Sequence, residues 1–175
     1  MRWHALILLT LLASLCSGAM AFAQGGGTEY RLGIGDKVKV VVFGQPDLTG
    51  EAEIDASGKI VVGLIGEVTA AGRPIAEVQT EIRNRLDKDY LVDPKVSVLM
   101  VAYRPITMLG QVKTPGRYPY SSGLTIRQAV ALAGGYDKRA STGAALVFRD
   151  GRELELEVDA LVRPGDTIEI QRRFF

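Results

Sequence analysis

Five acidic residues that lie close together in the sequence are the first candidates for catalysis: Asp36, Asp47, Glu51, Glu53 and Asp55. Two carboxylates held roughly 5 to 10 Å apart can hydrolyse a glycosidic bond. Glu51, Glu53 and Asp55, however, alternate along an expected strand, which is typical of a face in contact with solvent. Asp36 and Asp55 stand in turns, where aspartate accepts hydrogen bonds from the backbone. We therefore expect no catalytic residue.

Arg117-Tyr118-Pro119-Tyr120 is the segment whose residue types favour ligand binding. Tyrosine rings offer flat apolar faces with polar edges, and arginine pairs with acidic groups, so such a surface suits a sugar. The alternative is that the tyrosines pack against the turn that follows Gly116. We take Arg117, Tyr118 and Tyr120 as the candidate contact residues for a carbohydrate.

Residues 1–23 have the pattern of a secretory signal peptide. Arg2 and an apolar run at 5–15 precede Ala21-Phe22-Ala23, a small-x-small sequence that signal peptidase accepts. We predict cleavage between Ala23 and Gln24. The mature protein is then expected to be exported and soluble.

Loss of that segment would change which residue types are available. It holds the only histidine, the only cysteine and the only tryptophan of the chain. Without them we expect no histidine-dependent triad, thiol nucleophile, zinc site or disulfide, and no cofactor. Cys16 is not expected to carry a lipid, because Leu15 stands where a lipobox has a small residue. Since Arg2 is lost and no acid is, the net charge falls from +1 to zero, which favours neither nucleic acid nor anionic lipid as the main partner.

The rest of the sequence is typical of a folded protein with many short strands. The chain has 175 residues, 47% of them hydrophobic, and its 20 glycines and 7 prolines separate short apolar runs. Residues 24–29, with three consecutive glycines, are expected to form a flexible leader. Arg104-Pro105 is the expected boundary between two units, 30–103 and 104–171, and a tail follows at 172–175.

The first unit is expected to hold three strands, a helix and a further strand. Apolar residues at helical spacing after Pro74 predict the helix. The last strand is apolar on both faces, so we predict that it is covered on both sides. A turn at Asp55-Ala56-Ser57-Gly58 is predicted to join the second and third strands as a hairpin. The predicted strands are 37–43, 51–55, 59–64 and 96–103, and the predicted helix is 74–87.

The second unit is expected to contain one short helix among strands. Thr125 and Gln128 predict a capping box at the start of that helix, and Asp150-Gly151 predicts a hairpin. Gly165-Asp166 before the last strand repeats Gly35-Asp36 before the first. We interpret this repeat as shared turn chemistry, with duplication as the alternative. The predicted strands are 106–112, 144–149, 152–158 and 167–171, and the predicted helix is 126–133.

Two sets of short motifs follow one another along the chain. The first set is Tyr30 to Asp36, Val42-Phe43-Gly44, Asp55 to Ile60, Gly66-Glu67-Val68 and Asp93 to Val98, and the second is Leu109 to Val112, Pro115 to Tyr118, Leu124-Thr125 and Ala131 to Gly135. In this order they resemble the motifs of the bacterial polysaccharide biosynthesis/export family, and the resemblance covers about residues 30–171. It implies an α+β fold, in which a β-rich polysaccharide export domain at 30–103 is followed by one soluble ligand-binding β-grasp (SLBB) domain at 104–171.

The resemblance implies a non-catalytic, ring-forming component of a capsule or exopolysaccharide export conduit. Such a protein would be a homo-oligomer in the periplasm, associated with the outer membrane, and would contact the polysaccharide and an inner-membrane polysaccharide co-polymerase. Longer relatives end in a membrane-crossing helix, so we also expect a separate outer-membrane component, a β-barrel. The alternatives are a monomeric periplasmic carbohydrate-binding module and a small glycosidase.

Overall fold

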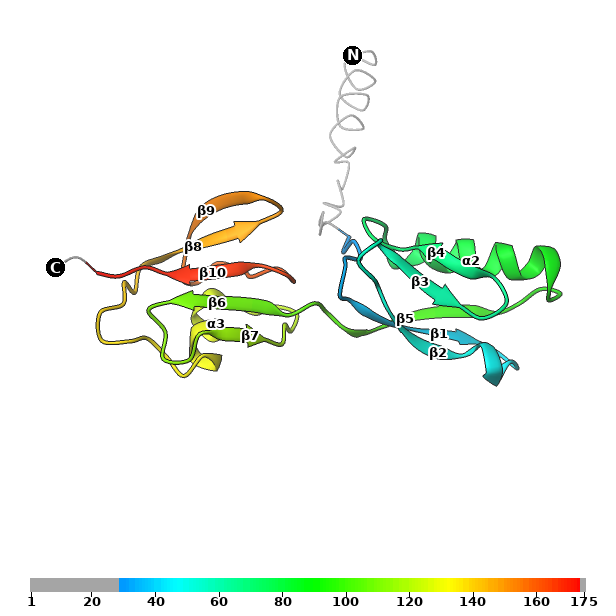
Figure 1. The fold of residues 1–175 in the computed structure, drawn as a ribbon, viewed down its shortest axis with the longest axis horizontal. Helices are drawn as coiled ribbons and strands as arrows, with labels where there is room; N and C mark the ends of the chain where they lie inside the picture. Colours follow the sequence, from blue (N-terminus) through cyan, green and yellow to red (C-terminus); the bar gives the residue numbers. More distant parts are fainter. Residues whose placement is uncertain (1–28, 174–175) are drawn as a thin grey trace, which may run out of the picture.

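The computed structural model describes residues 29–173 of the chain. The predicted signal peptide and its cleavage position at Ala23 and Gln24 lie outside the described residues. Two units lie end to end along the longest axis of the molecule (Figure 1). The N-terminal unit runs from β1 to β5 and the C-terminal unit from β6 to β10, and each has its own cluster of buried apolar side chains.

The N-terminal unit has a three-stranded antiparallel sheet in the order β2-β1-β5 and a separate β3-β4 pair. Its helix α2 lies along one side (Figure 1), and Val78, Ile82 and Leu86 face the core at helical spacing. Pro74 is the N-cap, with extended backbone, and not the first helical residue as predicted. The elements are β1 (Lys37–Val42), η1 (Pro46–Leu48), β2 (Gly50–Glu53), β3 (Lys59–Val62), β4 (Gly66–Thr69), α2 (Ile75–Asp89) and β5 (Val96–Ala102).

The predicted hairpin between the second and third strands is wrong, although its turn forms. Asp55 accepts hydrogen bonds from the backbone amides of Ser57 and Lys59, at 2.8 and 3.0 Å. Beyond the turn, however, β2 pairs with β1 and β3 pairs with β4. Opposite charges explain the first pairing, because Glu53 lies across from Lys37. The fourth strand, β4, was not predicted, because four residues with one buried side chain give little pattern.

The prediction that the last strand of this unit is covered on both faces is also wrong. Helix α2 covers one face of β5, where Val98 is buried and its amide donates to Gln79 at 3.1 Å. On the other face Leu99 and Val101 are 52% and 45% exposed. Only one helix, α2, packs on the three-stranded sheet, and it covers one face. The opposite face of β5, which carries Leu99 and Val101, therefore stays open.

The C-terminal unit has one five-stranded mixed sheet in the order β7-β6-β10-β8-β9. β10 is parallel to β6 and antiparallel to β8. The predicted hairpin around Asp150-Gly151 is confirmed, since β8 pairs with β9. The short strand β7 was not predicted. The elements are β6 (Ile106–Gly110), β7 (Gly116–Tyr118), α3 (Ile126–Leu132), β8 (Ala144–Arg149), β9 (Arg152–Glu157) and β10 (Thr167–Ile170).

Helix α3 begins as the sequence predicts. The Thr125 hydroxyl accepts from the Gln128 amide, and the Gln128 side chain accepts from the Thr125 amide, which confirms the capping box. Ile126, Ala129 and Val130 pack the helix onto the sheet. Both units therefore combine strands with one α-helix, and the α+β fold class is confirmed. Neither helix within residues 29–173 is long and apolar enough to cross a membrane.

Candidate functional site

Arg104 contacts both units at the point where the chain passes from β5 to β6. Its backbone amide donates to the Asp36 carboxylate at 2.7 Å. Its side-chain Nε donates to the Pro164 carbonyl at 3.0 Å. Asp36 precedes β1 and Pro164 precedes β10, so a single residue joins the first strand of one unit to the last strand of the other.

The Asp36 side chain is fully buried and organises the turn before β1. It accepts from the Gly33 amide at 2.7 Å and from the Tyr30 hydroxyl at 2.5 Å. Burial of Tyr30, together with this hydrogen bond to a carboxylate, raises the pKa of the phenol. With these donors and the Arg104 amide, Asp36 is occupied as a structural acceptor.

Asp166 has the matching position before β10 and is 1% exposed. It accepts from the Arg163 amide at 2.7 Å. Two further bonds come from the Arg149 guanidinium, at 2.9 and 2.7 Å. This bidentate hydrogen bonding raises the pKa of Arg149. The two Gly-Asp turns noticed in the sequence therefore meet on either side of Arg104.

Three tyrosines form a row across the junction. Tyr30 and Tyr103 lie edge to face with their ring centroids 5.1 Å apart, and Tyr103 and Tyr120 do so at 5.3 Å. Such pairs add stability beyond the area that they bury. Tyr120 also packs against the core of the C-terminal unit. The row therefore connects the segment before β1 with the segment after β7.

A cleft of about 610 Å³ opens beside this junction and is lined from both units. Its lining is rich in arginine and contains two tyrosines, which is the combination that suits an acidic sugar. The Arg163 side chain has no hydrogen-bond or ion-pair partner among residues 29–173, so it is available to a ligand. The charged and aromatic lining residues are Arg31, Arg104, Arg149, Arg163, Glu29, Asp150, Tyr30 and Tyr120.

The structure separates the three predicted contact residues. Tyr120 lines the cleft, whereas Arg117 and Tyr118 lie on β7 and do not. The Tyr118 hydroxyl donates to the Thr114 carbonyl at 2.6 Å, which is the turn-packing alternative. Arg117 is exposed. Contact with a carbohydrate stays a prediction for all three residues.

Arg149 and Arg163 line the cleft, but neither belongs to a sequence motif that marks it as a site residue. The repeated Gly-Asp dipeptide was the available signal, because it marks the two turns that border the cleft. It does not reveal which arginines bind the two aspartates. Arg104 lies 68 residues after Asp36 in the sequence, and Arg149 lies 17 residues before Asp166. Only the folded chain brings these segments together.

The carboxylates first considered for catalysis are spread over separate environments. Asp47, Glu51 and Glu53 are exposed, and Glu53 lies 3.4 Å from Lys37. Asp55 is exposed in its turn, where the hydrogen bond from Ser57 lowers its pKa. The solvent-facing interpretation is confirmed for Glu51, Glu53 and Asp55, although β2 ends at Glu53 and Asp55 lies in the turn that follows. No group of three histidine, cysteine, aspartate or glutamate side chains gathers as a metal site within the described chain.

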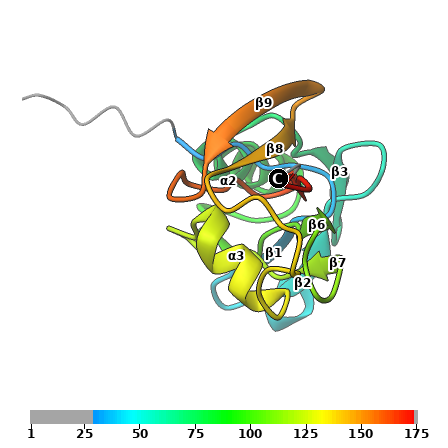
Figure 2. The ribbon, with the colours of Figure 1, turned by 90° about the vertical axis from the view of Figure 1, so that its left-hand side faces the viewer.

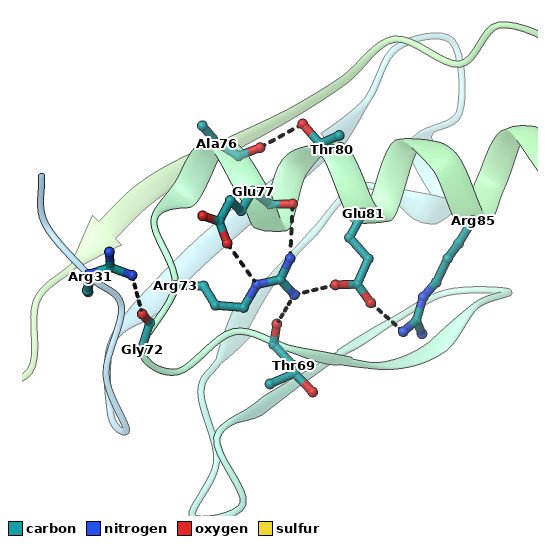
Figure 3. A network of polar contacts seen from close by, with 9 residues as sticks. All are labelled: Arg31, Thr69, Gly72, Arg73, Ala76, Glu77, Thr80, Glu81 and Arg85. Carbon is teal, nitrogen blue, oxygen red and sulfur yellow. Dashed lines mark hydrogen bonds and ion pairs between the residues drawn. The ribbon is translucent and has the colours of Figure 1, made fainter.

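A second hollow, of about 660 Å³, lies along the outer face of α2. Four of its charged residues, Arg73, Glu77, Glu81 and Arg85, already bind one another, as Figure 3 shows. Arg73 pairs with Glu81 and also donates to the Thr69 carbonyl at 3.0 Å. Arg85 pairs with Glu81 as well, and these arginines lower the pKa of that carboxyl. This network fixes α2 against β4, so the junction cleft is the better candidate for binding.

Comparison with known protein families gives two matches in succession along the chain. Residues 24–101 match the family described as polysaccharide biosynthesis/export protein. Residues 105–156 match the SLBB domain. The passage from one match to the other falls at the linker that contains Arg104.

Individual relatives carry related names. The exopolysaccharide production protein ExoF of Rhizobium meliloti is 36% identical over 147 residues, which are 77% of this chain and 34% of that protein. The EPS I polysaccharide export outer membrane protein EpsA of Ralstonia solanacearum is 28% identical over 165 residues, 79% of this chain and 44% of EpsA. The polysialic acid transport protein KpsD of Escherichia coli is 22% identical over 137 residues, 77% of this chain and 25% of KpsD. The chain thus spans less than half the length of these relatives.

Proposed function

Because the chain belongs to the polysaccharide biosynthesis/export protein family, we propose that it is a non-catalytic component of a capsule or exopolysaccharide export system. The N-terminal unit acts as the export domain and the C-terminal unit as the SLBB β-grasp domain. The protein works in the periplasm, at the outer membrane, with an inner-membrane co-polymerase and an outer-membrane component. The observation that carries this proposal is the succession of two family matches on two separately folded units.

The junction cleft contacts the polysaccharide. Arg163 supplies a cation without a partner among residues 29–173, and Tyr120 supplies an aromatic ring to the same cleft. Arginine binds carboxylates in a planar, two-pronged geometry, so uronic acids and other acidic sugars are the ligands that fit this lining. Tyr120 contacts the sugar in the cleft, while Arg117 and Tyr118 contact it along β7.

Binding of an acidic glycan tests the role of the cleft. Arg163→Glu is compared with Arg117→Glu on β7 and with the control Arg83→Glu on the exposed side of α2, which makes the same change of charge. We expect oligogalacturonate to bind the wild type and the control equally in calorimetry, and to bind Arg163→Glu at least tenfold more weakly. Neutral maltohexaose serves as the second probe. Equal binding of oligogalacturonate to all four proteins would contradict a role for the cleft.

The protein forms a ring through head-to-tail contacts between copies, as repeated heterologous contacts do when their rotation closes. Native mass spectrometry and electron microscopy of the purified protein, with and without the co-polymerase, test this. Closed rings are the expected result. A protein that stays monomeric at high concentration in both conditions would favour the carbohydrate-binding module, and loss of export in a deletion strain would test the pathway independently.

A further inference from the structure

Five cations gather at the free end of the C-terminal unit. They are Lys113, Lys138, Arg139, Arg172 and Arg173, and all five are exposed. None of them has an ion-pair partner among residues 29–173. We call this group the polar-end patch, because it lies at one pole of the long axis of the molecule. The three segments that carry it, 111–114, 136–141 and 171–173, contain a single acid, Asp137.

The backbone holds the polar-end patch together. The Lys113 amide donates to the Gly135 carbonyl at 3.1 Å, and the Arg173 amide donates to the Arg139 carbonyl at 2.7 Å. Ala140 and Arg172 form an isolated antiparallel bridge. Five like charges are thus kept close to one another at a cost in repulsion, although the sequence as a whole is almost neutral.

The place of the patch in the molecule limits what can cover it. The strands β6 and β10 are parallel and end at the same pole of the long axis, where the described chain reaches the C-terminus (Figure 1). Figure 2 looks onto this pole. The three segments lie outside the named helices and strands, and all five cationic side chains are exposed at this end of the molecule.

We propose that the polar-end patch binds the surface of an anionic lipid membrane. Clusters of four to eight lysines and arginines are typical of proteins that adsorb to anionic headgroups, and each cation near such a surface strengthens binding roughly fivefold. Phosphate headgroups supply negative charge to the four cations that Asp137, the single acid of the three segments, leaves unbalanced.

The net charge of the chain by itself does not predict this binding. A net charge near zero gives the whole protein no strong attraction to anions, but the fold brings together cations that lie apart in the sequence. Glu153 and Glu155 lie farther along the edge strand β9, whereas Glu157 lies across from Ala144, close to the segment 136–141. Five cations still outnumber Asp137 and Glu157 at the pole, and the field of this positive excess acts within about one Debye length of the surface.

The proposal is tested by measuring how the protein binds lipid vesicles. The protein is purified in the form that the producing cell exports. One set of vesicles contains equal parts of phosphatidylglycerol and phosphatidylcholine, and the other contains phosphatidylcholine alone. The test variant is Lys138→Glu/Arg139→Glu, both on an exposed loop. The control is Arg83→Glu/Lys95→Glu, which makes the same change of charge in the N-terminal unit. Circular dichroism verifies that both variants fold.

We expect cosedimentation with the anionic vesicles only, weakened by added salt, unchanged in the control and reduced at least tenfold in the test variant. Equal binding to both kinds of vesicle, or equal binding of the two variants, would overturn the proposal. Two other results would also overturn it. Loss of self-association in the test variant without loss of vesicle binding would assign the patch to a second copy, and weaker binding of soluble oligogalacturonate by the test variant, without loss of vesicle binding, would assign it to the glycan. No step uses the polysaccharide-export activity, so the outcome is independent of the proposed function.

Discussion

The turns before β1 and β10 share a Gly-Asp sequence and a buried carboxylate, yet they use it differently. In both turns the aspartate accepts from the backbone amide three residues earlier, at 2.7 Å. Asp166 then binds the Arg149 guanidinium through two hydrogen bonds within its own unit. Asp36 instead binds Tyr30 and the backbone of Arg104 in the linker.

The difference shows how one local motif serves two purposes. The shared part, an aspartate that closes a glycine turn, follows from the sequence of the turn itself. The partner of the remaining carboxylate oxygen decides whether the turn stabilises one unit or joins two. We therefore expect substitutions at Asp166 to act within the C-terminal unit, and those at Asp36 to act across the junction.

Asp166→Ala is expected to have the largest effect. It leaves the partly buried Arg149 side chain, which is 13% exposed, without its carboxylate partner, and the loss of one partner of a fully buried pair, about 3 to 5 kcal/mol, is the upper bound of the cost. Native-state hydrogen exchange should show faster exchange throughout β6, β8 and β10, with little change in α2. The exposed residue Asp137, replaced by alanine, is the control. Equal loss of protection in both units would contradict the local role of Asp166.

Asp36→Ala should lower the free energy of unfolding by less than Asp166→Ala does, but its effect should extend to both units. The amides of Gly33 and Arg104 and the Tyr30 hydroxyl lose their acceptor, at about 2 to 3 kcal/mol in all. We expect faster exchange around both β1 and the linker, and a broader distribution of dimensions in small-angle scattering. Asp47→Ala, on an exposed residue of η1, should change neither. Scattering identical to the wild type would show that Asp36 does not couple the units.

The glycines of the two turns separate backbone strain from contact with Arg104. A Cβ on Gly165 would lie 2.5 Å from the Arg104 Nε, and the residue has φ +83°, so alanine there should cost about 1 to 2 kcal/mol. A Cβ on Gly33 would lie 2.5 Å from the Arg104 Cζ, so the guanidinium would have to move and give up its hydrogen bond to Pro164, but Gly33 has no positive φ. Gly33→Ala should therefore cost less in urea unfolding than Gly165→Ala, which adds backbone strain. Equal costs at both positions would contradict this assignment.

Tyr30→Phe gives the smallest effect, and it appears at alkaline pH. Because the pKa of Tyr30 is raised in the folded protein, the unfolded chain releases this proton first. The contribution of Tyr30 to stability is therefore complete below about pH 10, the ordinary pKa of tyrosine, and falls as the pH rises above it. The variant should lose stability less steeply there than the wild type. Tyr118→Phe is the control, and parallel curves for the two variants would refute the assignment.

Elements with a strong local pattern could be predicted from the sequence. The spacing of Val78, Ile82 and Leu86 predicts α2, the Thr125 and Gln128 pair predicts the start of α3, and Asp150-Gly151 predicts the β8-β9 hairpin. The short strands β4 and β7 carry too few side chains to give a pattern. The pairing of β2 and the open face of β5 depend on which neighbours reach those strands, and local periodicity does not contain that information.

The candidate site was predictable only in part. Tyr120 was singled out for its residue type and does line the cleft, but Arg117 and Tyr118, chosen on the same grounds, do not. Arg104 was noticed as a boundary because it precedes a proline. It contacts Asp36, 68 residues earlier, and Pro164, 60 residues later. Only the tertiary structure reveals contacts over such separations.

The attachment of Arg104 to both units has a mechanical consequence. Its backbone amide is fixed to Asp36 and its side chain to Pro164, so a pull along the long axis loads these hydrogen bonds as well as the peptide chain. A twist of one unit about that axis also has to turn the tyrosine row. The linker therefore transmits tension and torque between the two halves, and force applied at one end of the molecule reaches the other.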